Sequence, residues 1–222
     1  MTTQLVIDRK FRGPTESANG GYTCGLLASF LHGPAEVTLR LPPPLERPLE
    51  VATEGALELR DGDDVVAEAA SAELDLEVPD PISFEEAAAA ALPEGDKESV
   101  FPECFVCGWA REDGLRIYAG PLEGRELVAA TWVPREDVIS PEFVWAALDC
   151  PGAYAVHFGV RGNPVLGRLT ARVEHLPHAG ERCIALGWPL GEDGRKLFAG
   201  TALYGEDGRV LGSARATWII PR

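Results

Sequence analysis

Residues 18–22 read Ala18-Asn19-Gly20-Gly21-Tyr22, a glycine pair that opens an apolar stretch in which Leu26, Leu27 and Phe30 follow Tyr22 at helical spacing. Two adjacent glycines let the backbone turn tightly and approach a ligand closely. The first amide hydrogens of a helix have no partner within the helix, so they can bind an oxyanion. The stretch therefore predicts a helix whose N-terminus can stabilise developing negative charge.

The segments that follow this helix predict an antiparallel meander. A short strand is expected before the helix, and Asp61-Gly62-Asp63 has the composition of a hairpin turn. The expected strands of this first half cover residues 5–7, 36–41, 49–60 and 64–78. Residues 79–97 are flanked by proline and rich in Ala and Glu, which indicates a connector with a short helix over 84–92.

The second half repeats this order of elements. A second helix begins at about Pro141, and the turns at 192–194 and 206–208 separate the last three strands. The strands expected here cover residues 115–118, 126–133, 166–173, 183–190, 196–204 and 210–219. Long antiparallel strands after one central helix predict the α+β class, with one domain over 1–97 and another over 98–222.

Composition limits the possible partners and the compartment. The 222-residue chain has a formal net charge of −15, which argues against nucleic acid or an anionic membrane as the main partner. The N-terminus lacks a secretion signal, and no run of about 18 apolar residues occurs, so we expect a cytoplasmic protein. Five cysteines are an odd number for a disulfide framework, and we expect them to be reduced.

A helix wrapped by a long antiparallel sheet, twice in one chain, resembles the double hotdog arrangement of the acyl-CoA thioesterase and dehydratase superfamily. Residues 19–22, followed by Leu26-Leu27-Ala28, resemble the opening of the hotdog helix in thioesterases, and residues 143–149 resemble the other half of such sites. The resemblance implies two tandem hotdog folds and an acyl-CoA or related thioester as substrate. It implies no cofactor beyond the coenzyme A of that substrate, and it implies a homodimer.

The resemblance also implies how the catalytic site is divided between the halves. In several of these families an acidic residue lies seven to eight positions beyond the glycine pair and acts across the interface. That position is Ala28 in the first half and Asp149 in the second, whereas Pro141 and Glu142 replace the glycines in the second half. The catalytic prediction is therefore Asp149 acting opposite the Gly20 and Gly21 amides, in one competent site.

Two alternatives remain open for this alignment. Another register places Gly21-Tyr22 over Ala153-Tyr154, so the correspondence depends on where the second helix begins. Asp149 could also serve only as the cap of a helix that restarts at Pro151.

Six residues are candidates for contact with the substrate. Aromatic side chains around Asp149 would exclude water and raise its basicity, although buried core aromatics have the same sequence pattern. The candidates are Asn19, Tyr22, Phe143, Trp145, Tyr154 and Thr170. Long-chain double hotdog thioesterases also use a Thr and a Gln from the second repeat, and the single glutamine of this chain is Gln4, so that version of the site is incomplete.

Residues 101–108 contain the pair Cys104 and Cys107, separated by two residues. A zinc site needs two further ligands. The spaced pair His175 and His178 has two intervening residues instead of the usual three to five. The segment is therefore predicted to be a structural turn, with no metal site.

Two hypotheses of function follow. The first is an acyl-CoA thioesterase-like hydrolase, in which Arg161, Arg168 and Arg172 could contact the phosphates of coenzyme A. The second is a non-catalytic protein that binds an acyl thioester or another small ligand. Residues 157–164 resemble the His-Phe-Pro-Gly segment of hotdog dehydratases only poorly. A hydroxyacyl dehydratase is less favoured, because His157 ends its helix where the family's His precedes it, and Ala171 stands where that family has a Glu.

Overall fold

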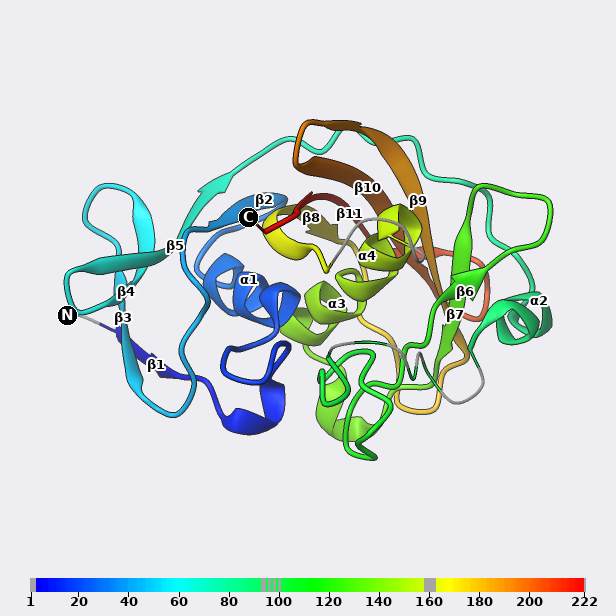
Figure 1. Ribbon diagram of the computed structural model, residues 1–222, viewed down its shortest axis with the longest axis horizontal. Coiled ribbons are helices and arrows are strands. Elements are labelled where there is room, and N and C mark those ends of the chain that lie inside the picture. Colours follow the sequence, from blue (N-terminus) through cyan, green and yellow to red (C-terminus); the bar gives the residue numbers. More distant parts are fainter. Residues whose placement is uncertain are drawn as a thin grey trace.

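The computed structural model describes residues 3–92, 95, 97, 99, 101–157 and 163–221. Over these ranges eleven strands form one sheet in the order β1-β3-β4-β5-β2-β8-β11-β10-β9-β7-β6. The strands are β1 Thr3–Val6, β2 Ala35–Leu39, β3 Pro48–Ala52, β4 Leu57–Asp61, β5 Asp64–Ser71, β6 Gly120–Pro121, β7 Val128–Trp132, β8 Val165–Val173, β9 Cys183–Asp193, β10 Lys196–Tyr204 and β11 Val210–Ile219. The sheet curves around a group of central helices (Figure 1).

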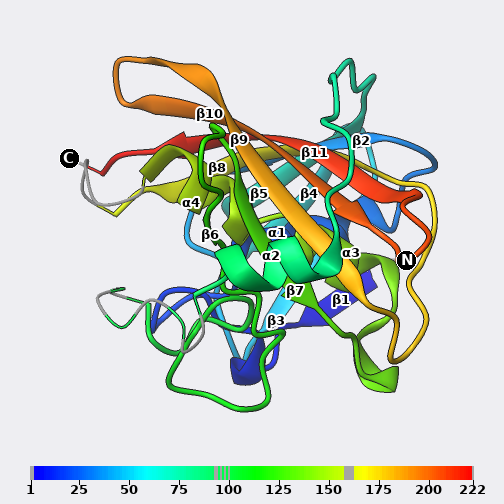
Figure 2. The same cartoon turned by 90° about the vertical axis from the view of Figure 1, so that its right-hand side faces the viewer.

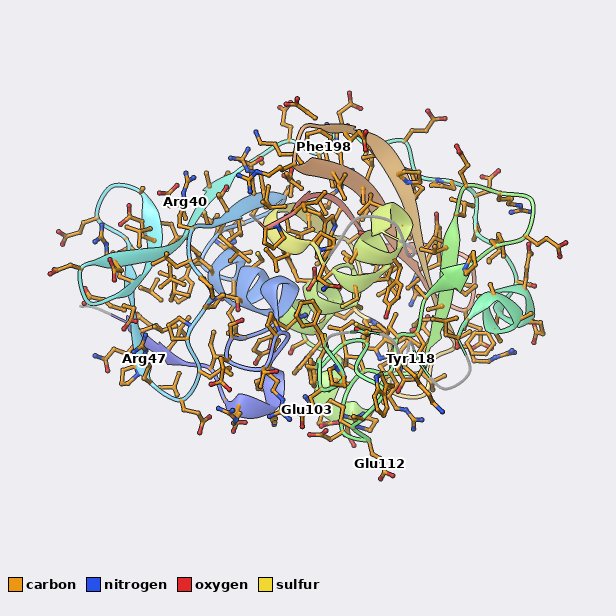
Figure 3. All side chains as sticks on the ribbon, in the orientation of Figure 1. Arg40, Arg47, Glu103, Glu112, Tyr118 and Phe198 are labelled. Atoms are coloured by element: carbon orange, nitrogen blue, oxygen red, sulfur yellow. The ribbon has the colours of Figure 1, made fainter. Side chains whose placement is uncertain are left out.

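The helices are α1 Gly20–Ala28, α2 Phe84–Ala90, α3 Pro141–Ala147 and α4 Cys150–His157, with short 3-10 turns at Arg9–Phe11 and Glu136–Val138. In Figure 1, α1, α3 and α4 lie in the middle of the protein, inside the curve of the sheet. Charged residues at the periphery, such as Arg47 and Glu112, point away from these helices (Figure 3). No helix in the described part of the chain is long and apolar enough to span a membrane.

α1 is a central helix, buried on almost every side. Asn19 caps its N-terminus, because Asn19 Oδ1 accepts a hydrogen bond from Tyr22 N at 2.9 Å. A Cβ atom at Gly25 would lie 2.6 Å from Glu142 Cα, so the glycine is what lets the backbones of α1 and α3 approach closely. From Gly21 to Gly25 the facing residues run back from Asp149 to Glu142, so the two helices are antiparallel.

The two faces of the sheet carry separate apolar clusters. Side chains alternate along each strand, so Ala129 of β7 faces one cluster and its neighbour Ala130 faces the other. α2, which Ser83 caps, packs with Ala87 on the outer face, over β7 and β9 (Figure 2). The inner face packs against α1, α3 and α4 and forms the main core.

One sheet joins the first and second halves of the chain. β2 and β8 pair antiparallel from Ala35↔Ala171 to Thr38↔Arg168. The main core also extends over both sides of the β2–β8 pair. Val37 of β2 and Leu169 of β8 are both fully buried in it. The α+β class predicted from the sequence is confirmed by this antiparallel sheet and its few helices.

Several predicted elements need correction. The expected strand over 49–60 is two strands, because the chain turns at Gly55 with φ of 97°. No strand forms over 115–118, where Arg116 has φ of 60° and the flanking amides instead donate to carbonyls of the 101–108 segment. The helix beginning at Pro141 is interrupted before α4, because Pro151 has no N–H to donate to the Ala147 carbonyl.

Candidate active site

A cavity of about 320 Å³ lies beside the N-terminus of α1. Its walls come from the loop before α1, from Ser99 and residues 101–107, from the start of α4, from the residues leading into β8 and from the end of β11. The lining includes Asn19, Gly20, Cys104, Cys107, Asp149, Cys150, Tyr154, Leu166 and Trp218. Residues from both halves of the chain therefore form one cavity.

Asp149 lies at the break between α3 and α4, and its side chain reaches α1. Only 3% of the residue is exposed. Oδ2 accepts hydrogen bonds from Asn19 Nδ2 at 2.8 Å and from Gly21 N at 3.0 Å. Oδ1 is buried and has no hydrogen-bond partner among the described residues. Burial raises the pKa of Asp149 to about 7, although the two donors oppose that shift.

These contacts distinguish between the alternatives that the sequence left open. The Asp149 carboxylate bonds to α1 and to Asn19, and the described hydrogen bonds do not connect it to amides of α4. A Cβ atom at Gly21 would lie 2.5 Å from Asp149 Cβ and 2.7 Å from the Trp145 carbonyl oxygen. Gly21 therefore packs against the end of α3 and Asp149, as the first alignment anticipates.

The four free amides at the start of α1 can be accounted for individually. Asn19 N donates to the Phe11 carbonyl at 2.8 Å, Gly21 N to the Asp149 side chain, and Tyr22 N to the Asn19 side chain. Gly20 N has no acceptor among the described residues. Because Gly20 also lines the cavity, its amide is the one that remains for a ligand.

The other predicted substrate contacts fall into two groups. Asn19 and Tyr154 line the cavity. Tyr22 and Phe143 instead pack with Phe11 and Phe105 in an aromatic cluster of the core. Two further candidates are also outside the cavity lining: Trp145 is buried in the core, and Thr170 Oγ1 donates to Glu36 Oε2 at 3.1 Å.

The arginines proposed to contact phosphate do not line the cavity where they are described. Arg168 Nε donates to Thr38 Oγ1 at 2.9 Å, and Arg172 pairs with Glu174 on the sheet surface. Arg161 lies outside the described residues. Residues 158–162, which follow the His157 compared with dehydratases, and the His157 side chain also lie outside the described part of the chain.

Sequence reasoning missed a cluster of three buried cysteines on the cavity wall. Cys104, Cys107 and Cys150 have Sγ atoms within 4.8 Å of one another. Hydrogen bonds from the other two thiols and from backbone amides lower the pKa of Cys104 well below its ordinary value. The pair Cys104 and Cys107 was visible in the sequence, but nothing in the spacing connected it to Cys150.

No protein-family model matches the chain, and no curated protein matches its sequence. Solved structures do match. A candidate thioesterase II from Thermobifida fusca has a TM-score of 0.68 at 13% identity, covering 100% of this chain and 94% of that one. A protein of unknown function with a hot dog fold from Alicyclobacillus acidocaldarius has a TM-score of 0.65 at 11% identity, covering 100% and 93%.

This chain has the hotdog fold. The resemblance noted in the sequence is thus confirmed at the level of the fold. A third match is the dehydratase domain of a mycocerosic acid synthase-like polyketide synthase, with a TM-score of 0.64 at 14% identity, covering 100% of this chain and 91% of that one. The fold is therefore shared with proteins named for hydrolysis and for dehydration, and the choice between these reactions depends on the residues of the cavity.

Proposed function

We propose that this hotdog protein hydrolyses an acyl-CoA or related thioester in the cavity that both halves of the chain build. One observation carries the proposal: Asp149 is buried on the cavity wall, two donors hold Oδ2, and Oδ1 has no partner among the described residues. A carboxylate held in this way is suited to act on a water molecule or on the substrate itself.

The proposed reaction uses atoms on opposite sides of the thioester. Asp149 Oδ1 takes a proton from a water whose oxygen attacks the carbonyl carbon. Gly20 N–H, which has no acceptor among the described residues, donates to the oxygen that becomes negative. The carbon–sulfur bond then breaks, and the thiol leaves with the proton that Asp149 returns. Asn19 and Gly21 position the carboxylate throughout.

We also propose that the fold consists of two tandem hotdog repeats, over 1–97 and 98–222. Each half has a central helix followed by antiparallel strands, and α1 packs antiparallel on α3. The repeats would meet at the β2–β8 pair. This division explains why the site needs both halves: the first supplies Gly20, and the second supplies Asp149.

A non-catalytic binding protein is the second candidate, and a specific contact favours it. Gly21 N–H, predicted from the resemblance to face the substrate carbonyl, donates to Asp149 instead. Among the amides described at the start of α1, that of Gly20 is then the one left to polarise a thioester. A dehydratase has less support, because the described lining of the cavity contains no histidine to move the required proton.

The test is thiol release from short, long and aromatic acyl-CoAs. Asp149→Asn keeps the shape of the side chain and removes the base, so we expect turnover to fall by about 10²- to 10⁴-fold. Glu142→Gln is the matched control, because this carboxylate lies on α3 and bonds to Ser140 outside the cavity lining. We expect it to keep wild-type turnover.

The outcomes separate the two candidates. Turnover lost in Asp149→Asn and kept in Glu142→Gln supports the hydrolase. Full turnover in Asp149→Asn removes this residue from the chemistry. If no acyl-CoA is cleaved while some bind tightly, the cavity serves for binding alone.

A further inference from the structure

The three cysteines on the cavity wall form a group that the proposed hydrolysis does not use. We propose that Cys104, Cys107 and Cys150 bind one zinc ion. Thiolate sulfur is the ligand that zinc prefers in sites of this kind, and two of the cysteines have the separation typical of a zinc half-site.

The distances between the sulfur atoms fit a tetrahedral metal ion. With zinc–sulfur bonds of about 2.3 Å, two sulfurs on a tetrahedron lie about 3.8 Å apart. Cys104 Sγ and Cys150 Sγ are 3.8 Å apart, and all three sulfurs lie within 4.8 Å of one another. Closing the cluster onto one ion therefore needs movements of about 1 Å or less. A disulfide, by contrast, would engage two of the sulfurs and leave the third.

The backbone around Cys104 is already arranged to donate to a metal-bound thiolate. The amides of Val106 and Cys107 lie on the Cys104 thiol side of this turn and contribute to lowering the pKa of Cys104, and Gly108 N closes the turn onto the Cys104 carbonyl at 2.8 Å. A Cβ at Gly108 would lie 2.5 Å from Cys104 N and O, so the tight turn requires glycine. Amides aimed at a ligand sulfur are the outer contacts that orient metal ligands.

The Asn19 side chain provides a further donor near Cys104 Sγ. Asn19 Nδ2 lies 3.9 Å from Cys104 Sγ and also donates to Asp149. The segment is further tied to the first half of the chain by the ion pair of Arg12 with Glu103, a residue labelled on this segment in Figure 3. Contacts with the first half of the chain therefore hold the 101–108 segment in place.

The arrangement predicts the form of the site. The described chain supplies three clustered ligands, and all three line the cavity. Three protein ligands leave a fourth position for water, which is the pattern of an open zinc site. Binding displaces the thiol protons of the three cysteines to solvent, and it requires no oxidant or reductant.

The first experiment titrates the reduced, metal-free full chain with Co²⁺ and then with Zn²⁺. We expect thiolate-to-cobalt charge-transfer bands and the visible bands of a tetrahedral site, saturating at one equivalent and abolished by one equivalent of Zn²⁺. Cys104→Ser and Cys150→Ser should weaken binding by more than about 100-fold. Cys183→Ser is the matched control, because Cys183 is also a buried cysteine but lies outside the cavity lining.

A second measurement on the wild-type chain avoids variants that fail to fold. Alkylation followed by mass spectrometry should show that Zn²⁺ slows modification of Cys104, Cys107 and Cys150, and leaves the rates at Cys24 and Cys183 unchanged. The proposal is overturned if neither ion binds, or if the cobalt bands survive in both Cys104→Ser and Cys150→Ser. None of these readouts depends on thioester hydrolysis, so the zinc site and the proposed function fail or succeed separately.

Discussion

Replacing Gly21 with alanine tests the contact that joins the two halves of the site. The new Cβ would lie 2.5 Å from Asp149 Cβ and 2.7 Å from the Trp145 carbonyl oxygen. Neither atom is the end of a flexible side chain. Because ordinary contacts begin at 3.4 Å, α1 and the end of α3 must separate by about 0.9 Å. The Gly21 N to Asp149 Oδ2 hydrogen bond, now 3.0 Å, would then be lost.

The cost can be estimated from these contacts. Overpacking costs about 1–3 kcal/mol, and a lost hydrogen bond to a charged group costs about 1.5–3 kcal/mol. Alanine returns about 1 kcal/mol through its higher helix propensity. We expect Gly21→Ala to lower the free energy of unfolding by about 1.5–5 kcal/mol.

Gly25→Ala is the matched control. Its Cβ would lie 2.6 Å from Glu142 Cα and 2.8 Å from Trp145 Cβ, so it meets the same pair of helices. Gly25→Ala gains the same helix propensity as Gly21→Ala, but it breaks no hydrogen bond to Asp149. We therefore expect a cost of about 0–2 kcal/mol.

The assay is urea denaturation followed by tryptophan fluorescence, with the m-values of all variants compared. Gly21→Ala should be less stable than Gly25→Ala by about 1.5–3 kcal/mol. Equal losses in the two variants would refute a stabilising role for the Gly21–Asp149 hydrogen bond. Wild-type stability in Gly21→Ala would refute the close packing itself.

Three further substitutions test other contacts. Thr201→Val removes the 2.8 Å hydrogen bond to the Leu148 carbonyl at the helix break, and we expect thermal and urea unfolding to show a loss of about 1–3 kcal/mol. Arg111→Ala removes bonds to the Lys10 and Glu103 carbonyls, and it should cost about 2–3 kcal/mol and speed proteolysis within the 101–113 segment. Burial, and then the charge of Asp80, raises the pKa of Tyr204 to about 12. Between pH 10 and 12 the unfolded state therefore loses this proton while the folded state keeps it, so stability falls as pH rises. Tyr204→Phe should flatten that decline in denaturation curves recorded across this range, and an unchanged slope would contradict the assignment.

Much of the fold could be predicted because its signals are local. β10 and β11 have the bounds expected from alternating apolar residues and from the turn at 206–208. The prediction of a single strand over 49–60 was wrong, although the signal that ends the strand is also local. A turn at Gly55 interrupts a run of residues with high strand propensity. The strand expected over 115–118 fails for a different reason, because the amides there bond to the 101–108 loop, which the sequence cannot show.

The site could be predicted only in part. The proximity of Gly21 and Asp149 was anticipated because the family resemblance supplies a rule that relates the two helices. The aromatic candidates were harder to place, since a buried aromatic side chain has the same pattern whether it faces a cavity or a core. Tyr22 and Phe143 join the core cluster, whereas Tyr154 lines the cavity.

The sequence by itself determined most of the helices and strands and the antiparallel class, because these depend on neighbours along the chain, and it showed which residue types are available for chemistry. Only the tertiary structure decided which distant groups meet. Cys150 reaches Cys104 across 46 positions, because Pro151 breaks the helix and turns the chain there toward the cavity. Contacts of that range depend on how helices and strands pack, and residue spacing carries no record of packing.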